Sequence, residues 1–280
     1  MARDMIEKEI KPVIEETVLE VRLARGALDL EGAQRLRYRV FIEELGAPGG
    51  PLVDHVRRLE RDALDPHFDH LVLVDRRRDP AMLEHVIGVY RLLPGERAEA
   101  LGRFYCDSEY DLAPLRGLGR KLVELGRSCV AREHRRGPAM MLLWKGLADY
   151  VLSREIEILF GVASFHGADA TRHAAALSYL HHNHLAPPEL RVRALPGHFT
   201  PMDRMPASDV DPRAALAAVP PLIRAYLRLG GFVGEGAYID TEFNTTDVCL
   251  IMDTSAMSER YLDYYARKAG KPTATLDHPA

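Results

Sequence analysis

The sequence has few cysteines and no long apolar run, and each shortage excludes a class of protein. Its three cysteines, Cys106, Cys129 and Cys249, lie far apart and have no Cys-x-x-Cys spacing, so we expect reduced thiols rather than a disulfide framework. No apolar run reaches the ~18 residues that span a bilayer. The charged start MARDMIEKEIKPVIEE contains no signal-peptide core. These absences predict a cytoplasmic protein.

Neither sign of charge dominates the chain. The 280 residues include 37 Lys and Arg against 41 Asp and Glu, a net charge of −4. This balance gives no electrostatic reason to expect nucleic acid as a partner. Hydrophobic residues make up 47% and charged residues 28%, which excludes a mostly disordered chain. At this length a chain buries roughly three quarters of its unfolded surface, so we expect a substantial core.

Several motifs of catalysis and binding are also missing. The chain has no Gly-x-Ser-x-Gly elbow of a serine hydrolase and no Gly-x-Gly-x-x-Gly after a predicted strand. The acidic segment 60–69 lacks the spacing and the glycine of a calcium loop. The cluster HHNH (181–184) could suggest a metal, but no acidic or cysteine residue is spaced to complete a site. We therefore expect no bound metal.

The hydrophobic pattern predicts an α/β protein with a mixed sheet. Periods of two and of 3.6 residues alternate along the first two thirds of the chain. The two strands joined by RRRDPAMLE are expected to form a hairpin. The predicted strands are 17–24, 70–75, 85–93, 121–130 and 156–165, and the predicted helices are 30–45, 140–152 and 167–183.

The remainder of the chain predicts smaller elements. Residues 196–212 are rich in Pro, Asp and Met and are expected to be irregular. A short helix over 220–230, one or two strands within 232–253 and a terminal helix over 258–270 follow. Because these pieces look too small to fold alone, we expect one domain over 1–280. Its core would be 17–195, with a C-terminal elaboration over 196–265 packed on that core.

Arginines and carboxylates occur together in otherwise apolar segments. Arg37 falls in the middle of the apolar arc formed by Ala33, Leu36, Val40, Phe41 and Leu45. A buried arginine is costly unless it meets an anion, although its head could instead reach water along a buried stem. The acidic loop supplies Glu60, Asp62, Asp65 and Asp69, which would otherwise form a solvated loop, and later strands carry Arg91, Glu124 and Arg127.

Glu124 and Arg127 lie three residues apart in a predicted strand. A regular strand would point the two side chains to opposite faces, but a bulge at Gly126 could turn both to one side. An edge-strand ion pair without function is the alternative interpretation.

The segment HRRGPA (134–139) lies between a predicted strand and an apolar helix. Backbone N–H groups at a helix N-terminus bind phosphate or pyrophosphate, and Arg135 and Arg136 would add positive charge. We interpret this segment as a candidate anion-binding loop. Solvated loop arginines are the alternative.

These residues together resemble the GNAT acyltransferase superfamily. HRRGPA is similar to its phosphopantetheine-binding loop (Arg/Gln)-x-x-Gly-x-(Gly/Ala), with His134 in place of the usual first residue. Four further motifs resemble, in order, the signature of acyl-homoserine-lactone synthases. They are RYRVF (37–41), Glu-x-Asp-x-x-Asp (60–65), YRLLP (90–94) and ELGR (124–127).

Within that group, the chain most resembles the bacterial ornithine lipid N-acyltransferases. The resemblance extends over most of residues 20–255, including DPHFDHLVLVD, PPLIRAYLRLGG and IDTEFNTTDVCLIMD. It implies a GNAT-like, mostly antiparallel sheet flanked by helices. It also implies transfer of a 3-hydroxyacyl group from acyl carrier protein to the α-amine of an amino acid, L-ornithine, in ornithine lipid biosynthesis.

The resemblance also assigns roles to residues. Glu124 is the first candidate for the base and Glu60 the second, and Ser164 is a candidate for stabilising the leaving thiolate. The residues expected to organise the site or bind substrate are Arg37, Phe41, Asp62, Asp65, Arg91 and Arg127. Those expected to hold phosphopantetheine are Arg135, Arg136, Gly137 and Ala139.

The expected partners are acyl carrier protein and an amino acid, with no cofactor beyond the acyl-carrier co-substrate. The expected location is the cytoplasm, with transient association at the inner-membrane surface. An acyl-homoserine-lactone synthase and an N-acyltransferase that uses glutamine or lysine remain alternatives. A catalytically silent module that binds acyl carrier protein or a membrane is a third. The buried acids and arginines argue against this module, which has no need of them.

Overall fold

The computed structural model of the chain describes residues 18–256. These residues form two compact units. Unit 1 comprises residues 18–104, 125–147 and 240–244, and unit 2 comprises 105–124, 148–239 and 245–256. The division into a core over 17–195 and an elaboration over 196–265 stays a prediction. The terminal helix expected over 258–270 lies outside the described residues.

Unit 1 is built on antiparallel strands. β1 (Leu19–Leu23) pairs with β2 (Asp69–Asp75), and β2 pairs with β3 (Val86–Pro94), so the predicted hairpin is confirmed. β3 neighbours β5 (Leu122–Val130), which belongs to both units because the boundary falls after residue 124. β2 and β3 are buried along almost their whole length, because both faces of these strands are covered.

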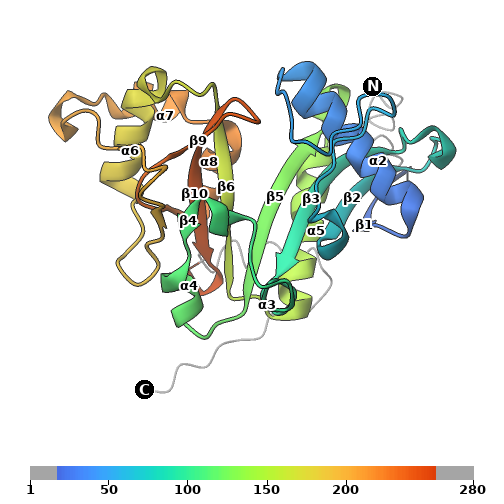
Figure 1. The fold of residues 1–280 in the computed structure, drawn as a ribbon, viewed down its shortest axis with the longest axis horizontal. Coiled ribbons are helices and arrows are strands. Elements are labelled where there is room, and N and C mark those ends of the chain that lie inside the picture. The colour runs from blue at the N-terminus through green and yellow to red at the C-terminus, as the bar shows by residue number, and fades with distance from the viewer. Residues whose placement is uncertain (1–17, 257–280) are drawn as a thin grey trace, which may run out of the picture. The chain divides into compact units, whose positions relative to one another are not determined.

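The two faces of β1–β3 are covered by different helices (Figure 1). Arg22 of β1 bonds to Asp29 of α2 (Ala27–Arg37), so this side of the strand faces α2. The neighbouring Val21 faces the opposite side, where it meets the middle of α5 (Ala139–Arg154). A Cβ on Gly146 of α5 would lie 2.5 Å from Val21 Cγ2. Glycine therefore permits the close approach of α5.

The helix predicted over 30–45 is confirmed, but its second half is unusual. After α2 the chain continues as a π-helix over Tyr38–Glu44, and the N–H of Leu45 bonds to the carbonyl of Val40, five residues earlier. Leu45 was expected to lie on the apolar arc that this helix buries. That prediction is wrong, because Leu45 is 43% exposed. The wider turn changes the angle between successive residues, so the arc predicted for a regular α-helix does not extend to Leu45.

Unit 2 contains both parallel and antiparallel strand pairs. The first residues of β5 pair in parallel with β6 (Ile158–His166), from Leu122–Ile158 to Glu124–Phe160. β6 pairs along its whole length with antiparallel β10 (Thr245–Asp253), and β10 pairs with β8 (Phe232–Val233) and β9 (Tyr238–Asp240). The predicted mixed, mostly antiparallel sheet flanked by helices and extended by C-terminal strands is confirmed.

Shorter elements complete the fold. The helices expected over 167–183 and 220–230 are confirmed as α6 (Ala174–His184) and α8 (Pro221–Arg228). Within residues 18–256, no helix has the length and apolar character needed to cross a bilayer. The sequence did not predict α3 (Gly95–Leu101), α4 (Ala113–Gly117), α7 (Pro212–Ala218) or the small pair of β4 (Tyr110–Asp111) and β7 (Arg193–Ala194).

Candidate active site

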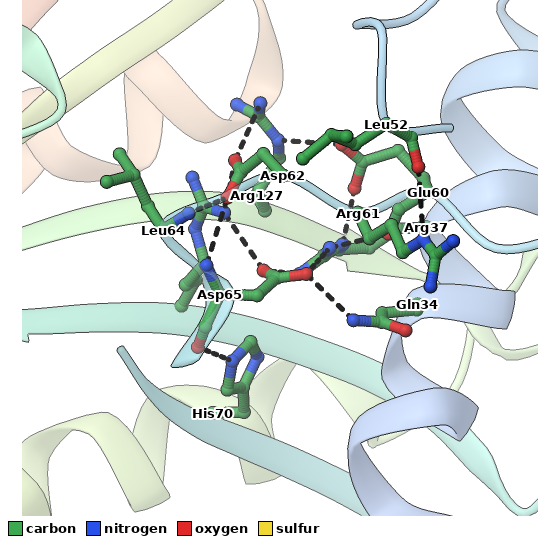
Figure 2. Close-up of polar contacts among 11 residues, drawn as sticks. Gln34, Arg37, Leu52, Glu60, Arg61, Asp62, Leu64, Asp65, His70 and Arg127 are labelled. Carbon is green, nitrogen blue, oxygen red and sulfur yellow. Dashed lines mark hydrogen bonds and ion pairs between the residues drawn. The ribbon is translucent and has the colours of Figure 1, made fainter. Parts of the chain in front are cut away.

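Arg37, the last residue of α2, is enclosed by carboxylates of the acidic loop (Figure 2). Its Nη1 and Nη2 atoms donate to Asp65 Oδ1 and Oδ2 at 2.9 and 2.7 Å. Its Nε atom lies 2.5 Å from Glu60 Oε2. The side chain is completely buried, which rules out the alternative in which its head reaches water. Burial alone would lower the pKa of Arg37, but the charges of Glu60 and Asp65 raise it overall.

Arg91 of β3 contacts the same loop. Its Nη1 atom lies 2.5 Å from Asp62 Oδ2 and 3.0 Å from Asp65 Oδ1, and its guanidinium carbon lies 4.2 Å from the centre of the Phe68 ring. The other oxygen of Asp62 accepts hydrogen bonds from the N–H groups of Leu64 and Asp65. Burial would raise the pKa of Asp62 and of Asp65, but the neighbouring arginines lower both. The loop is therefore an ordered part of unit 1, and the solvated interpretation is wrong for these acids.

Arg127 of β5 forms longer ion pairs with these acids than Arg37 and Arg91 do. Its Nε atom lies 3.4 Å from Glu60 Oε1 and its Nη2 atom 3.5 Å from Asp62 Oδ2. Its guanidinium lies 4.3 Å from the centre of the Phe243 ring, and Phe41 packs edge-on against that ring at 6.0 Å. The Arg127 side chain is 12% exposed, whereas Arg37 and Arg91 are sealed. Arg127 is thus the arginine of this group most open to solvent.

The backbone of β5 is irregular at Arg127. Its φ is 50°, in the left-handed region that costs a non-glycine residue about 1–3 kcal/mol. The sequence predicted the irregularity at Gly126, one residue earlier. The bulge suggested at Gly126 stays a prediction, and the residue with positive φ is its neighbour Arg127, whose side chain contacts Glu60, Asp62 and Phe243.

The group formed by Arg37, Arg91, Arg127, Glu60, Asp62 and Asp65, here called the arginine–acid cluster, balances three positive against three negative charges. Two of its neighbours were missed from the sequence. Gln34 Nε2 donates to Asp65 Oδ2 at 2.9 Å, and His70 Nε2 lies 3.0 Å from the Asp65 carbonyl oxygen. Gln34 precedes Arg37 by one helical turn, and His70 lies opposite Arg91 in the β2–β3 register. Asp69 lies outside the cluster and pairs with Arg97.

Glu124 is held by a different set of groups, within unit 2. Its Oε2 and Oε1 atoms accept hydrogen bonds from the N–H groups of Tyr105 and Cys106, each at 2.7 Å. These N–H groups begin the short 3₁₀ turn Cys106–Ser108. The Glu124 carboxylate is almost fully buried. The structure therefore assigns Glu124 and Arg127 separate partners, although both come from β5.

The predicted phosphopantetheine loop connects a 3₁₀ turn, Arg132–His134, to the N-terminus of α5. Arg135 turns back onto the chain, where it donates to the Val130 carbonyl at 2.9 Å and to Glu44 Oε2 at 2.7 Å. Arg136 and Gly137 are exposed, and Ala139 is the buried first residue of α5. The first N–H groups of any helix lack intrahelical acceptors, so this end of α5 can bind an anion.

Ser164 is exposed on β6, opposite Asp247 of β10 in the antiparallel register. Its assignment to the leaving thiolate stays a prediction, as do the other catalytic and binding roles. Within residues 18–256, no group of three or more His, Cys, Asp or Glu side chains is placed to hold a metal ion.

Comparison with known proteins places these residues in a family. The family described as "Acetyltransferase (GNAT) domain" matches residues 36–145, which include the arginine–acid cluster and the HRRGPA loop. A solved structure of a CoA-dependent acyl-homoserine lactone synthase, BjaI, is 16% identical with a TM-score of 0.45, over 90% of this chain and 87% of that one. Similarity at that level supports no inference about substrate.

Two sequence relatives are much closer to this chain. An L-ornithine N(alpha)-acyltransferase of Rhodobacter capsulatus is 59% identical over 249 residues, covering 89% of this chain and 95% of that protein. Another, of Rhizobium meliloti, is 43% identical over 255 residues, covering 90% of this chain and 86% of that protein. The chain is therefore an acyltransferase of the GNAT type and belongs to the L-ornithine N(alpha)-acyltransferase family.

Proposed function

We propose that this protein transfers a 3-hydroxyacyl group from acyl carrier protein to the α-amine of L-ornithine, giving lyso-ornithine lipid. The observation that carries the proposal is the 59% identity to the Rhodobacter capsulatus enzyme, which extends over nearly the whole of both chains. The ordered arginine–acid cluster adds support, because a chain without catalytic function has no need to bury so many charges.

The reaction needs a free amine. The α-ammonium of the acceptor must lose a proton before its nitrogen can attack the thioester carbonyl. Glu124 is the first candidate for accepting this proton, directly or through water. Each of its oxygens accepts one backbone N–H bond, which fixes the position of the carboxylate. Glu60 is the second candidate, but it is sealed between Arg37 and Arg127.

The other steps concern the thioester. The new C–N bond forms as the C–S bond breaks, and the released thiolate takes up a proton. Pairing of β5 with β6 ends at Glu124, so backbone N–H groups of β5 beyond this residue are candidates for polarising the carbonyl. Ser164 stays the candidate for stabilising the thiolate.

The three arginines divide between the two roles that the sequence left open. Arg37 and Arg91 are sealed and saturated with carboxylates, which suits ordering the acidic loop. Arg127 is partly exposed and its ion pairs are long. We assign Arg127 to the α-carboxylate of the acceptor, because a guanidinium can bind a carboxylate through two parallel hydrogen bonds.

Acyl carrier proteins are acidic, so docking requires a local cationic surface. Arg132 and Arg136 both precede α5 and are exposed, which makes them the proposed docking residues. The product carries a long acyl chain, and we propose that the enzyme meets the inner-membrane surface transiently to release it.

Incubation of the purified protein with 3-hydroxyacyl carrier protein and L-ornithine, followed by mass spectrometry, tests the proposal. We expect N-acylornithine, with little acylation of glutamine or lysine when each replaces ornithine. A parallel reaction with S-adenosylmethionine tests the synthase alternative, for which acyl-homoserine lactone would appear. A protein that binds acyl carrier protein but acylates none of these acceptors would instead be the silent module.

A further inference from the structure

The first residue of the HRRGPA loop has an arginine from another segment beside it. The motif that this loop resembles usually carries Arg or Gln at its first position, where this chain has His134. The Nε2 atom of His134 lies 3.3 Å from Nη2 of Arg78. Because a guanidinium can only donate hydrogen bonds, the histidine nitrogen is the acceptor and carries no proton. The positive charge at this position therefore belongs to Arg78.

Arg78 lies in the turn between β2 and β3, 56 residues before His134. Its backbone N–H donates to the carbonyl of Asp75 at 3.1 Å, and its Nη1 atom donates to the carbonyl of Glu84 at 3.1 Å. Its Nε atom lies 3.6 Å from Asp75 Oδ2. Asp75 ends β2, and Glu84 lies just before β3. Contacts at both ends of the turn thus help to direct the guanidinium toward the loop.

Glu133, which precedes His134, is held by the same arginine. Its Oε1 atom lies 3.6 Å from Arg78 Nη2 and 3.5 Å from Nη2 of Arg39 in the π-helix. All four residues belong to unit 1. Residues 133 and 134 therefore lie between the β2–β3 turn and the π-helix, and both of these segments contribute an arginine.

The guanidinium of Arg78 is accessible to a ligand. Its side chain is 28% exposed, and its ion pairs with Asp75 and Glu133 are both 3.6 Å long. Long ion pairs between partly exposed groups contribute little to stability. Arg78 can therefore exchange a carboxylate contact for an anionic ligand at small cost in free energy.

We propose that Arg78 supplies the positive charge at the first position of the HRRGPA loop and binds there the phosphate of the donor's phosphopantetheine group. This inference rests on the proposed function. The phosphate diester that joins phosphopantetheine to a carrier protein has one negative charge and two free oxygens. A guanidinium can donate to both oxygens in parallel. The donor site is then assembled from two segments that lie far apart in the sequence.

The test compares two forms of one partner. Holo and apo acyl carrier protein differ only in the phosphopantetheine group, so the ratio of the Kd for apo to the Kd for holo isolates the contribution of that group. We expect Arg78→Met to reduce this ratio roughly 3- to 10-fold, since a charge-assisted hydrogen bond of a partly exposed group is lost. In acyl transfer, the KM for the carrier protein should rise by a similar factor, and the KM for ornithine should not change.

A double variant separates the charge of Arg78 from a role in holding the turn. Arg78→Met with His134→Arg places the guanidinium in the loop itself, and we expect it to recover most of the wild-type ratio. A ratio that stays low in the double variant would show that Arg78 acts through the structure of the turn, which overturns the inference. Arg78→Gln, which keeps a donor and removes the charge, replaces Arg78→Met if that variant does not fold.

Arg77→Met is the matched control. Arg77 lies in the same turn, is largely exposed and pairs with Asp75 at 2.8 Å. Its substitution should leave the ratio unchanged. A wild-type ratio in Arg78→Met, or equal Kd values for the two carrier forms in the wild type, overturns the inference. The Kd ratio does not require turnover, so failure of the wild type to acylate ornithine would contradict the proposed function while the ratio still decides the role of Arg78.

Discussion

The guanidinium of Arg37 lies side-on against the carboxylate of Asp65, with one nitrogen on each oxygen at 2.9 and 2.7 Å. The two residues are 28 positions apart in the sequence, and both are buried. This pair ties the end of α2 to the acidic loop. Because Asp65 also accepts from Gln34 and Arg91, it is the residue on which the cluster converges.

Replacing Asp65 with Asn should therefore destabilise the protein strongly. The substitution leaves two buried arginines with less compensating charge, and losing one partner of a buried pair costs roughly 3–5 kcal/mol. Urea unfolding at neutral pH measures the change in the free energy of unfolding. Arg58→Ala is the control, because the Arg58–Glu43 pair is largely exposed and should contribute less than about 1 kcal/mol. Similar losses in both variants would contradict the central role of Asp65.

Asp29 should make stability depend on pH in acid. Burial would raise the pKa of Asp29, but hydrogen bonds from Arg22, the Arg25 N–H and His85 lower it to about 2. A depressed folded-state pKa adds stability that is present above the unfolded value, about 3.9, and is lost as the pH falls toward 2. Asp29→Asn should thus weaken the decline in unfolding free energy between these pH values. Parallel curves for the variant and the wild type would show that Asp29 contributes nothing there.

Glu124→Gln should lower kcat by roughly 10²–10⁴, the usual contribution of a positioned proton acceptor. The amide can accept from only one of the two N–H groups that Glu124 now binds, so the turn at Tyr105 would also shift. Ser108→Ala controls for this shift, because it removes another hydrogen bond of the same turn and keeps the carboxylate.

The pH dependence of kcat separates the two roles of Glu124. If it is the base, the acid limb of the profile should disappear in Glu124→Gln and persist in Ser108→Ala. Near-normal turnover in Glu124→Gln at saturating substrates would exclude Glu124 and make Glu60 the candidate.

If acyl carrier protein is the donor, as we propose, its recognition should depend on Arg132 and Arg136. Of the basic residues near the loop, Arg135 is engaged by Glu44, and Arg120 and Lys121 pair with Asp253 and Glu155. The double variant Arg132→Glu with Arg136→Glu should raise the KM for the carrier protein much more than the KM for ornithine.

This effect should weaken at high salt, because the Debye length falls from about 10 Å at 0.1 M to 3 Å at 1 M. Arg213→Glu, which changes an exposed arginine of unit 2, is the matched control. Equal KM values for the carrier protein in wild type and double variant, at low salt, would place docking elsewhere.

The cysteines should resist alkylation in the folded protein. Burial raises the pKa of Cys129 to about 12 and that of Cys106 well above its usual value, and Cys249 is also buried. Since the thiolate is the reactive form, iodoacetamide at pH 8 should leave the native protein unmodified and should modify three sites in urea. Mass spectrometry measures the modification, and rapid modification of the native protein would contradict the burial of these three thiols.

The sequence by itself determined the order of the main elements and the inward position of Arg37. Both depend on local periodicity, since residues 3.6 or two apart share a face whatever the rest of the chain does. The hairpin of β2 and β3, the apolar helix α5 and the helical character of 30–45 followed in this way. Short elements such as α3 and α4 did not, because a few residues give too little periodicity to detect.

Only the tertiary structure decided which groups meet. Arg37 contacts Asp65, but the sequence could not choose Asp65 over Asp69, which pairs with Arg97 instead. Likewise Glu124 accepts hydrogen bonds from the backbone N–H groups of Tyr105 and Cys106, which no local pattern predicted. Such partners are fixed by the path of loops and by the register of strands, which depend on the packing of distant segments. The sequence therefore shows which side chains can carry charge or form hydrogen bonds. Which of them contact one another depends on long-range packing, which no local pattern contains.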